Sequence, residues 1–313
     1  QPYRLSRRIA CGAFFMVCLF SLAQAAYPSE KAISLQEAEL IAELIFQNEC
    51  AGKDANLLYW NDGENFPSLG IGHFIWYPAN YNGPFDESFP KLLLFLQGKG
   101  VSLPESFQTL PGMCAPWLTK ADFMKALENG ELEPLREFLI ETKSGQAVFI
   151  IERFSRSISK ILQTVPRESR HSLQQKFVLM LKADSGLYPL VDYVNFNGEG
   201  ILESERYKGE GWGLLQVLEE MKIPAEEPGV VFEFVKAVER ILDRRISNSP
   251  RERNEIRWLP GWKTRIRTYL TARTPARPLD AHFLRENLLS AVAADVQLAE
   301  SASFPIENMA PSP

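Results

Sequence analysis

Residues 34–77 read SLQEAELIAELIFQNECAGKDANLLYWNDGENFPSLGIGHFIWY, and this stretch decides the fold. Ser34 is followed three positions later by Glu37, the reciprocal capping pattern of a helix N-terminus. Apolar side chains then recur at helical spacing as far as Phe46 and define one buried stripe. Glu49 continues that stripe at the helix end, where burial is expected to raise the pKa of its carboxyl group, as a general acid requires. The alternative is that Glu49 turns out to water at a frayed last turn.

The second half of the stretch predicts a β-hairpin. Two short runs of aromatic and branched residues, 58–60 and 66–71, flank the Asn-Asp-Gly turn at 61–63. Asp62 is then expected at the tip of the hairpin and Ser68 on its returning strand. The alternative is that Asp62 is an ordinary turn residue and Ser68 only a small residue on a strand.

These residues resemble the catalytic hairpin of phage-type lysozymes. That family has an Asp, a Thr six residues on, and then I-G-I-G-H. Here Ser68 lies six residues after Asp62, and the sequence continues L-G-I-G-H to His73. The family's acid is a Glu at the end of the preceding helix, which is the place of Glu49. The chain departs from the family in a longer connector between Glu49 and Asp62 and in Ser replacing Thr.

The resemblance implies an α+β, lysozyme-like fold, mostly helical with a small β-hairpin lobe, and cleavage of peptidoglycan glycan strands without a cofactor. Glu49 would protonate the leaving oxygen, while Asp62 and Ser68 hold the attacking water on the opposite sugar face, so the reaction would invert the anomeric configuration. The lysozyme-like domain is expected over residues 26–273, with an enlarged helical insert at about 78–187 that the resemblance does not cover.

Helical spacing recurs through much of the remaining chain. Thr119 precedes Asp122 by three residues and predicts a helix N-terminus. Further helices are expected at 91–97, 132–140, 147–162, 172–181, 230–246 and 258–270. Residues 274–313 are rich in Pro and Ala and are expected to be loosely attached.

Two later segments also resemble phage-type lysozymes. Residues 188–200 look like the central helix that ends beneath the substrate cleft, so Asn195 and Asn197 are candidates for sugar contacts; a polar helix end closed by Gly198 explains them equally well. Residues 258–270 look like the closing helix, in which Arg265 would orient Glu49 by a charge-assisted hydrogen bond. Sugars stack on aromatic rings, and the further candidates for substrate binding are Tyr59, Trp60, His73 and Trp212.

A rival catalytic site and a non-catalytic function remain open. Residues 213–216, G-L-L-Q, are similar to the G-L-M-Q motif of lytic transglycosylases. Glu199 lies fourteen residues before that motif, but Gly200 replaces the Ser that follows the family's Glu. The other alternative is a lysozyme-like module that binds peptidoglycan or a partner without cleaving it, which the longer connector favours.

The N-terminal residues predict export. Arg7 and Arg8 precede an apolar run that ends in Ala-Gln-Ala at 23–25, the pattern of a cleaved secretory signal. An uncleaved membrane anchor is the alternative, and no later segment is apolar enough to cross a bilayer. The mature protein is therefore expected in the periplasm or outside the cell, without stable membrane insertion.

Charge and cysteine content limit the partners. Removing residues 1–25 removes three arginines and no acid, so the net charge changes from −5 to −8, which argues against nucleic acid as a partner. Residues 236–277 nevertheless hold twelve Lys and Arg against four Asp and Glu. They form either a basic patch for an anionic polymer or a solvated helix face. Cys50 and Cys114 would be the mature cysteines and are expected to form a disulfide in an oxidising compartment. The Cys and His spacing fits no metal site.

Overall fold

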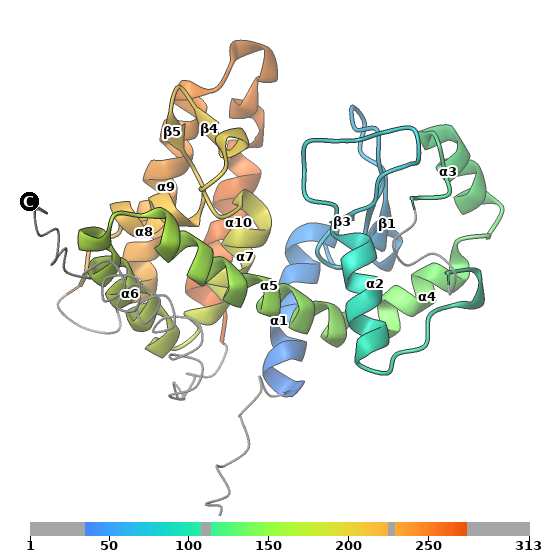
Figure 1. The fold of residues 1–313 in the computed structure, drawn as a ribbon, viewed down its shortest axis with the longest axis horizontal. Coiled ribbons are helices and arrows are strands. Elements are labelled where there is room, and N and C mark those ends of the chain that lie inside the picture. Colours follow the sequence, from blue (N-terminus) through green and yellow to red (C-terminus); the bar gives the residue numbers. More distant parts are fainter. Residues whose placement is uncertain (1–34, 108–113, 225–228, 274–313) are drawn as a thin grey trace, which may run out of the picture. The chain divides into compact units, whose positions relative to one another are not determined.

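The computed structural model describes residues 35–107, 114–224 and 229–273. Within these ranges the chain is mostly helical and has two small antiparallel sheets, so the predicted α+β class is confirmed (Figure 1). The expected signal peptide at 1–25, the tail at 274–313 and the side chains of the Ser34–Glu37 capping pattern lie outside the described residues.

The first helix, α1 (Leu35–Cys50), packs against the long helix α5 (Lys143–Thr164). Its predicted apolar stripe is buried, with Ala38, Ile41 and Ile45 fully excluded from water. This burial supplies most of the stability of such a helix, because an isolated helix of this length is marginal in water. The stripe therefore fixes which face of α1 points inward, and with it the direction of Glu49 at the helix end.

The predicted hairpin forms the three-stranded sheet. After a short 3-10 helix η1 (Asp54–Leu57), β1 (Leu58–Tyr59) pairs with β2 (Ser68–Leu69), which pairs with β3 (Phe74–Ile75). The register sets Tyr59 opposite Ser68 and Leu58 opposite Leu69. Ser68 is thus on the returning strand, as the sequence predicted.

The turn after β2 rests on a buried glutamine of α5. The backbone N–H of Ile71 donates to Oε1 of Gln146 at 2.9 Å, and Nε2 of Gln146 donates to the carbonyl of Leu139 at 2.7 Å. Gly70 adopts φ +73, and a Cβ there would lie 2.4 Å from Gln146 Oε1. Only glycine fits this close approach, so the G-I-G-H segment ties the hairpin to α5 and sets the position of His73.

The helices in the middle of the chain are α2 (Phe89–Gly98), η2 (Glu105–Phe107), α3 (Lys120–Glu128), α4 (Glu133–Glu141) and α6 (Arg167–Lys182). Here α2 packs against β3 and α5, and α4 packs against η1 and α5, whereas α6 packs against α5 and the C-terminal helices. The N-terminus of α3 has the predicted capping box, in which Asp122 N–H donates to Thr119 Oγ1 at 3.2 Å and Thr119 N–H donates to Asp122 at 3.1 Å.

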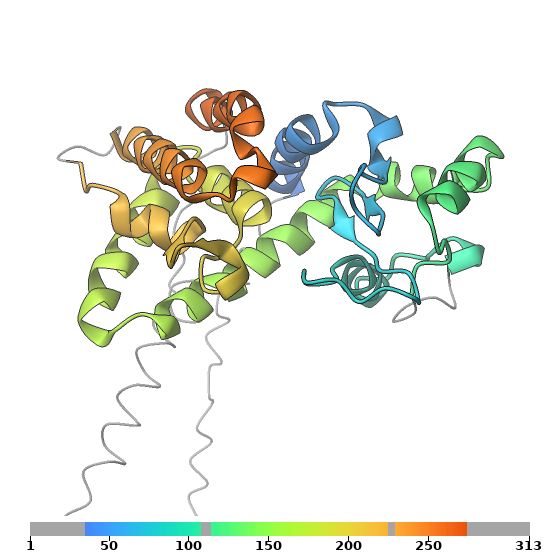
Figure 2. The same ribbon diagram turned by 90° about the horizontal axis from the view of Figure 1, so that it is seen from above.

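The C-terminal part is built on α9, which runs beside both α8 and α10 (Figure 2). The helix predicted at 230–246 is α9 (Val230–Asn248), with Phe234, Val238 and Ile241 fully buried. The remaining elements are α7 (Leu187–Asn197), η3 (Glu203–Glu205), β4 (Arg206–Tyr207), β5 (Glu210–Gly211), α8 (Leu214–Glu220), η5 (Arg251–Arg253), η6 (Glu255–Trp258) and α10 (Leu259–Thr271).

Candidate active site

Glu49 lies in the last turn of α1, where three other segments converge on its carboxyl group. Its side chain is 15 % exposed. Arg265 of α10 donates from Nη2 to Oε1 of Glu49 at 2.6 Å, and Asn195 of α7 donates to the same oxygen at 3.3 Å. Nδ1 of His73 lies 3.6 Å from the other oxygen, Oε2. The structure thus brings together four of the residues that the sequence selected.

A buried aspartate fixes Arg265 in this position. Asp192 of α7 is fully buried and accepts from Nε and Nη2 of Arg265, both at 2.8 Å, and from the hydroxyl of Tyr269 at 2.6 Å. A two-point contact of this kind holds the plane of the guanidinium as well as its position. Asp192 was not predicted from the sequence, although a single carboxylate within the apolar run 187–194 was a usable signal.

The structure corrects the expected protonation state of Glu49. Burial raises the pKa of its carboxyl group, but the charges of Arg265 and His73 and the hydrogen bonds from Arg265 and Asn195 lower it. The net result is a pKa below the ordinary value of 4.5. Glu49 is therefore ionised at neutral pH in this structure, because its burial is accompanied by a guanidinium.

His73 connects Glu49 to a cavity on the hairpin. Its backbone has φ +45, a left-handed conformation that is uncommon for a residue with a side chain and is often found at functional sites. The imidazole stacks on the ring of Tyr59, with centroids 5.9 Å apart and planes inclined by 12°. The cavity has a volume of about 260 Å³ and is lined by Tyr59, Asn61, Glu64, Phe66, Ser68, His73, Ile75 and Phe85.

Asp62 does not line this cavity, contrary to the expectation that it acts beside Ser68. Its side chain is 97 % exposed and pairs with Nζ of Lys120 on α3 at 2.5 Å. The hydrogen bond and the charge of Lys120 lower the pKa of Asp62. The physical reason is the Asp62-Gly63 turn, with φ +91 at Gly63, which directs the tip of the hairpin to solvent.

Glu64 is the carboxylate of the hairpin that lines the cavity, and it was not predicted from the sequence. Burial raises the pKa of Glu64, while a hydrogen bond from Asn61 and the charge of His73 lower it less. Nε1 of Trp60 donates to the backbone carbonyl of Glu64 at 2.8 Å and holds that residue in place. Residues 64, 66 and 68 all line the cavity, but the chain bends at 65 and 66 and the strand begins only at Ser68, so strand alternation alone does not predict the position of Glu64.

Three of the expected sugar-binding residues are buried instead. Trp60 is 4 % exposed and packs against Phe123. Trp212 is 7 % exposed, with the guanidinium of Arg245 4.4 Å from its ring, and Asn197 is 5 % exposed and accepts from Nη1 of Arg245 at 2.7 Å. Trp60 is thus packed against α3, and Trp212 and Asn197 are held by Arg245 of α9, so none of the three side chains is open to a ligand.

The expected disulfide is also wrong for this structure, in which Cys50 and Cys114 are both free. Cys50 is fully buried at the end of α1, with its Sγ 3.7 Å from Nε2 of His73, whereas Cys114 is exposed. Burial raises the pKa of the Cys50 thiol to about 12, so the thiol is protonated and is no nucleophile at neutral pH. Sequence alone could not tell that the two cysteines face different surroundings.

The rival carboxylate Glu199 is engaged elsewhere. It follows α7 and accepts from Oγ of Ser157 at 2.5 Å and from Nζ of Lys160 at 3.0 Å, both on α5. Its side chain is 17 % exposed and does not line the hairpin cavity. Glu203 and Ser204, which also precede the G-L-L-Q segment, are exposed on η3.

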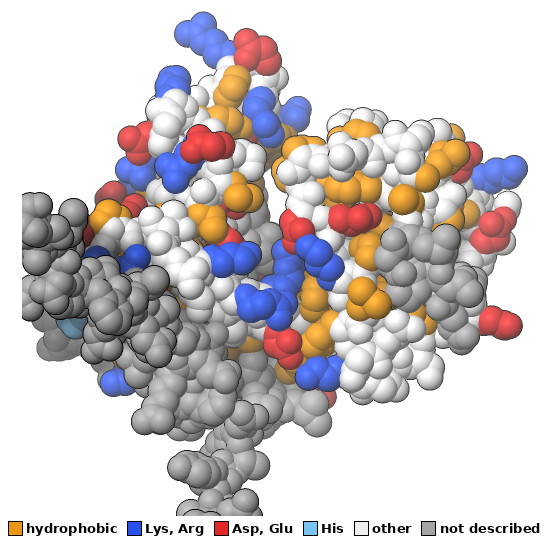
Figure 3. All heavy atoms as spheres, viewed as in Figure 1, with side chains coloured by type: hydrophobic (Ala, Val, Ile, Leu, Met, Phe, Trp, Pro, Cys, Tyr) orange, Lys and Arg blue, Asp and Glu red, His pale blue; other side chains and the backbone are white. Residues whose placement is uncertain are grey.

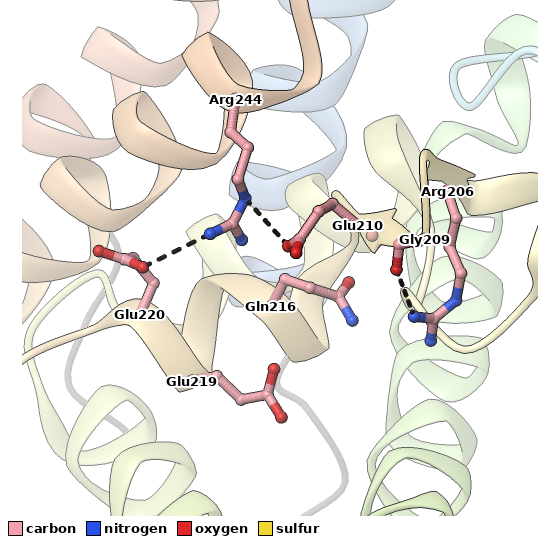
Figure 4. A pocket seen from close by; sticks show the side chains of 8 residues that line it. Arg206, Gly209, Glu210, Gln216, Glu219, Glu220 and Arg244 are labelled. Carbon is pink, nitrogen blue, oxygen red and sulfur yellow. Dashed lines mark hydrogen bonds and ion pairs between the residues drawn. The ribbon is translucent and has the colours of Figure 1, made fainter. Parts of the chain in front are cut away.

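A second cavity, of about 320 Å³, lies among β4, β5, α8 and α9 (Figure 4). Nε of Arg244 lies 3.6 Å from Oε2 of Glu210, and Nη1 of Arg244 lies 3.8 Å from Oε2 of Glu220. The Nε atoms of Arg206 and Arg244 are buried from water, so a ligand in the cavity does not reach them. The charges that line this cavity largely neutralise one another.

The basic residues at 236–273 are likewise distributed among ion pairs. Arg245 pairs with the buried Glu255 at 2.8 Å, and Arg240 pairs with Glu220 at 2.7 Å. Figure 3 shows acidic and basic side chains beside one another on the face that it draws. This arrangement fits a solvated and ion-paired surface better than one continuous basic field.

Comparison with protein-family models, with curated proteins and with solved structures gives no match. In the described parts of the chain, no three His, Cys, Asp or Glu side chains are grouped to hold a metal ion. Every helix within the described ranges falls short of the length or the hydrophobicity that crossing a bilayer demands.

Proposed function

We propose that this protein is a glycoside hydrolase that cleaves the glycan strands of peptidoglycan, with a lysozyme-like fold similar to that of phage-type lysozymes. The observation that supports this most directly is the setting of Glu49. It ends the helix before the S-L-G-I-G-H hairpin, and Arg265 of the closing helix donates to it at 2.6 Å. His73, the last residue of the hairpin motif, lines the hairpin cavity, and its Nδ1 lies 3.6 Å from Oε2 of Glu49.

The lining of the hairpin cavity suits a sugar. Tyr59 is 44 % exposed and Phe85 is 53 % exposed, and both line the cavity. Flat aromatic rings accept the C–H faces of a pyranose, while the hydroxyl of Ser68 and the amide of Asn61 can bond to sugar hydroxyl or acetamido groups. A mostly apolar cavity with a few convergent polar groups and carboxyl groups of shifted pKa is the usual form of such a site.

The substrate and the compartment follow from the same proposal. The expected signal at residues 1–25 would deliver the protein to the periplasm or to the outside of the cell, where peptidoglycan is accessible. The proposed partner is the glycan strand itself, and the chemistry needs no cofactor.

The test is product analysis of purified peptidoglycan by mass spectrometry after incubation with the protein. A glycoside hydrolase leaves reducing ends that carry one added water. Anhydro-sugar ends would instead indicate a lytic transglycosylase, a function for which the pairing of Glu199 with Ser157 and Lys160 offers no support. Unchanged strands would reject both enzymatic functions.

A binding module without activity is the second candidate. The observation in its favour is that Asp62, which aligns with the family's second carboxylate, points to solvent and pairs with Lys120. Sedimentation of the protein with insoluble peptidoglycan, together with unchanged strands in the product analysis, would establish this function.

A further inference from the structure

We propose that Asp192 is a positioning residue of this site, which holds Arg265 with a single nitrogen on Glu49 and offsets the charge of the guanidinium. In this way Asp192 sets the pH range in which Glu49 can act as the acid. The inference rests on the proposed function and deepens it, because it names the charge that controls the acid of that site.

The guanidinium of Arg265 is bound mainly by Asp192. Among the described residues it donates three hydrogen bonds to carboxylates, and two of them go to Asp192. Nε donates to Oδ2 and Nη2 donates to Oδ1 of Asp192, both at 2.8 Å. The same Nη2 donates to Oε1 of Glu49 at 2.6 Å. One nitrogen thus contacts both carboxylates, and the two-point contact with Asp192 decides where that nitrogen points.

Asp192 is itself held in place by donors from two other helices. The hydroxyl of Tyr269 on α10 donates to Oδ2 at 2.6 Å, and Nδ2 of Asn48 on α1 lies 3.4 Å from Oδ1. Asn48 in turn donates to the hydroxyl of Tyr188 at 2.7 Å. The side chain of Asp192 is fully excluded from water, so solvent screens its charge only slightly.

The two carboxylates share the charge of one cation. Burial lowers the pKa of Arg265, but the charges of Asp192 and Glu49 raise it to well above its ordinary value. An arginine beside a single carboxyl group lowers the pKa of that group by about 1–3. Asp192 offsets part of this cation, so Arg265 lowers the pKa of Glu49 less than it would alone. Glu49 therefore keeps its proton to a higher pH than it would beside an uncompensated arginine.

The other titratable groups that face these two carboxyl groups lie on α1, on the turn before β3, on α7 and on α10: Cys50, His73, Tyr188 and Tyr269. Nδ1 of His73 lies 3.6 Å from Oε2 of Glu49. Burial raises the pKa of Cys50 to about 12 and raises the pKa values of both tyrosines, so these three groups are neutral at and below neutral pH. On α5, Lys143 pairs with Asp54 at 2.8 Å. Replacing Asp192 leaves all of these groups in the chain, so a changed pH profile reports the loss of its charge.

A purely structural Asp192 would behave differently. If its carboxylate only joined α7 to α10, replacing it would lower the free energy of unfolding and the amount of active protein. The pH dependence of the remaining activity would stay as in wild type. The position of the pH profile therefore distinguishes the two roles, whereas loss of activity alone does not.

The first experiment is the pH profile of kcat/KM on solubilised glycan strands of peptidoglycan, for wild type and Asp192→Asn. An acid must be protonated, so activity falls as pH rises through the pKa of Glu49. Asparagine keeps an oxygen that can accept from Nη2 of Arg265 but removes the charge. The ionised form of Glu49 is then favoured, and the alkaline limb should move by about one pH unit or more to lower pH. An alkaline limb that stays in place, or moves to higher pH, overturns the inference.

Tyr269→Phe is the matched control, because it removes a donor to the same carboxylate and leaves the charge of Asp192 in place. It is expected to unfold at a lower urea concentration than wild type and to keep the wild-type alkaline limb. An alkaline limb that moves as far in Tyr269→Phe as in Asp192→Asn would show that general loosening, and not charge, controls the profile.

Carbon-13 NMR of carboxyl-labelled glutamate follows Glu49 directly, with its signal assigned by its absence in Glu49→Gln. The titration midpoint of Glu49 should decrease from wild type to Asp192→Asn by as much as the alkaline limb moves. Equal midpoints in the two proteins overturn the inference, even if their activities differ.

A second background covers the case in which Asp192→Asn does not fold, since that variant leaves the buried cation of Arg265 with one carboxylate fewer. Arg265→Gln is then compared with the double variant Arg265→Gln/Asp192→Asn, which has no uncompensated cation. Loss of the Asp192 charge should again lower the titration midpoint of Glu49, because a like charge beside it is removed. An unchanged or higher midpoint in the double variant overturns the inference.

Failure of this inference is separate from failure of the proposed function. Wild-type protein that leaves no hydrolytic products on peptidoglycan rejects the function and, with it, the role of Asp192 in catalysis. Wild-type protein that hydrolyses the strands, with the same alkaline limb as Asp192→Asn, rejects only the role given to Asp192.

Discussion

Glu49 accepts its hydrogen bonds through one oxygen, so a glutamine in its place can keep those bonds and still lose the charge. We expect Glu49→Gln to remain folded and to lose hydrolytic activity by about 10²-fold or more, because an amide neither delivers nor takes up a proton. Release of soluble muropeptides, measured by liquid chromatography, gives the activity. Glu199→Gln is the control and should change it little. The reverse pattern, an active Glu49→Gln and an inactive Glu199→Gln, would favour the transglycosylase.

Cys50 and Cys114 differ in accessibility, which makes their labelling predictable. Cys114 is exposed, whereas Cys50 is buried and its pKa is raised to about 12 by burial and the charge of Glu49. Iodoacetamide should therefore modify Cys114 in the native protein and both cysteines after denaturation without reductant. Peptide mass mapping assigns each site. If neither thiol reacts in the denatured, unreduced protein, the two form the disulfide that the sequence predicted, and the free thiols of this structure are wrong.

Among the secondary-structure elements, α1, α7 and α10 meet at Arg265, whose side chain is 9 % exposed. Arg265→Met would leave Glu49 and Asp192 as buried carboxylates without their shared cation. Removing one partner of a buried pair typically destabilises a protein by about 3–5 kcal/mol, and we expect a loss of this order in urea unfolding. Arg267→Met, on an exposed position of the same helix, is the control and should stay within about 0.5 kcal/mol of wild type. Equal stabilities of the two variants would show that the contacts of Arg265 with Glu49 and Asp192 do not stabilise the folded protein.

At the scale of the whole molecule, the buried carboxylates make stability depend on pH. The pKa values of Glu49 and Glu255 are lowered in the folded protein, despite burial, by Arg265 and Arg245 respectively and by hydrogen bonds. A lowered folded-state pKa contributes stability that is present above the unfolded value, near 4.5, and is lost as pH falls through the folded value. The free energy of unfolding should therefore decrease from pH 5 to pH 3. Glu49→Gln should show a shallower decrease, and Glu203→Gln, at an exposed position, the wild-type decrease. A Glu49→Gln profile parallel to wild type would contradict this linkage.

Local patterns in the sequence were sufficient for much of the fold. Helical spacing located α9 within two residues, and the Thr119–Asp122 pattern predicted the start of α3. The Asp-Gly turn between aromatic runs predicted the hairpin and placed Ser68 on its second strand. These features depend on interactions between residues close in the chain, which is why residue type and spacing are enough to predict them.

The proposed site itself was only partly predictable. Glu49 and Arg265 were selected on the family resemblance, and they contact each other in the structure. Asp62 and Asn197 were selected in the same way, whereas Trp60 and Trp212 were selected as aromatic rings that can stack on a sugar. The structure places Asp62 in solvent and the other three in packed interiors. Residue type indicates that a side chain can contribute to a site, but exposure depends on which neighbours the fold brings against it.

The sequence by itself determined the α+β class, the capping and periodicity of individual helices, and the hairpin that follows Glu49. Only the tertiary structure decided which carboxyl groups face the cavity and in which charge state. The pKa of Glu49 is lowered, despite burial, by an arginine 216 residues away in the chain. Glu64 lines the hairpin cavity, whereas Asp62, two residues earlier, points to solvent and pairs with Lys120. The burial of a carboxyl group and the charges around it depend on residues that are distant in the sequence, and those residues come next to the group only when the chain has folded.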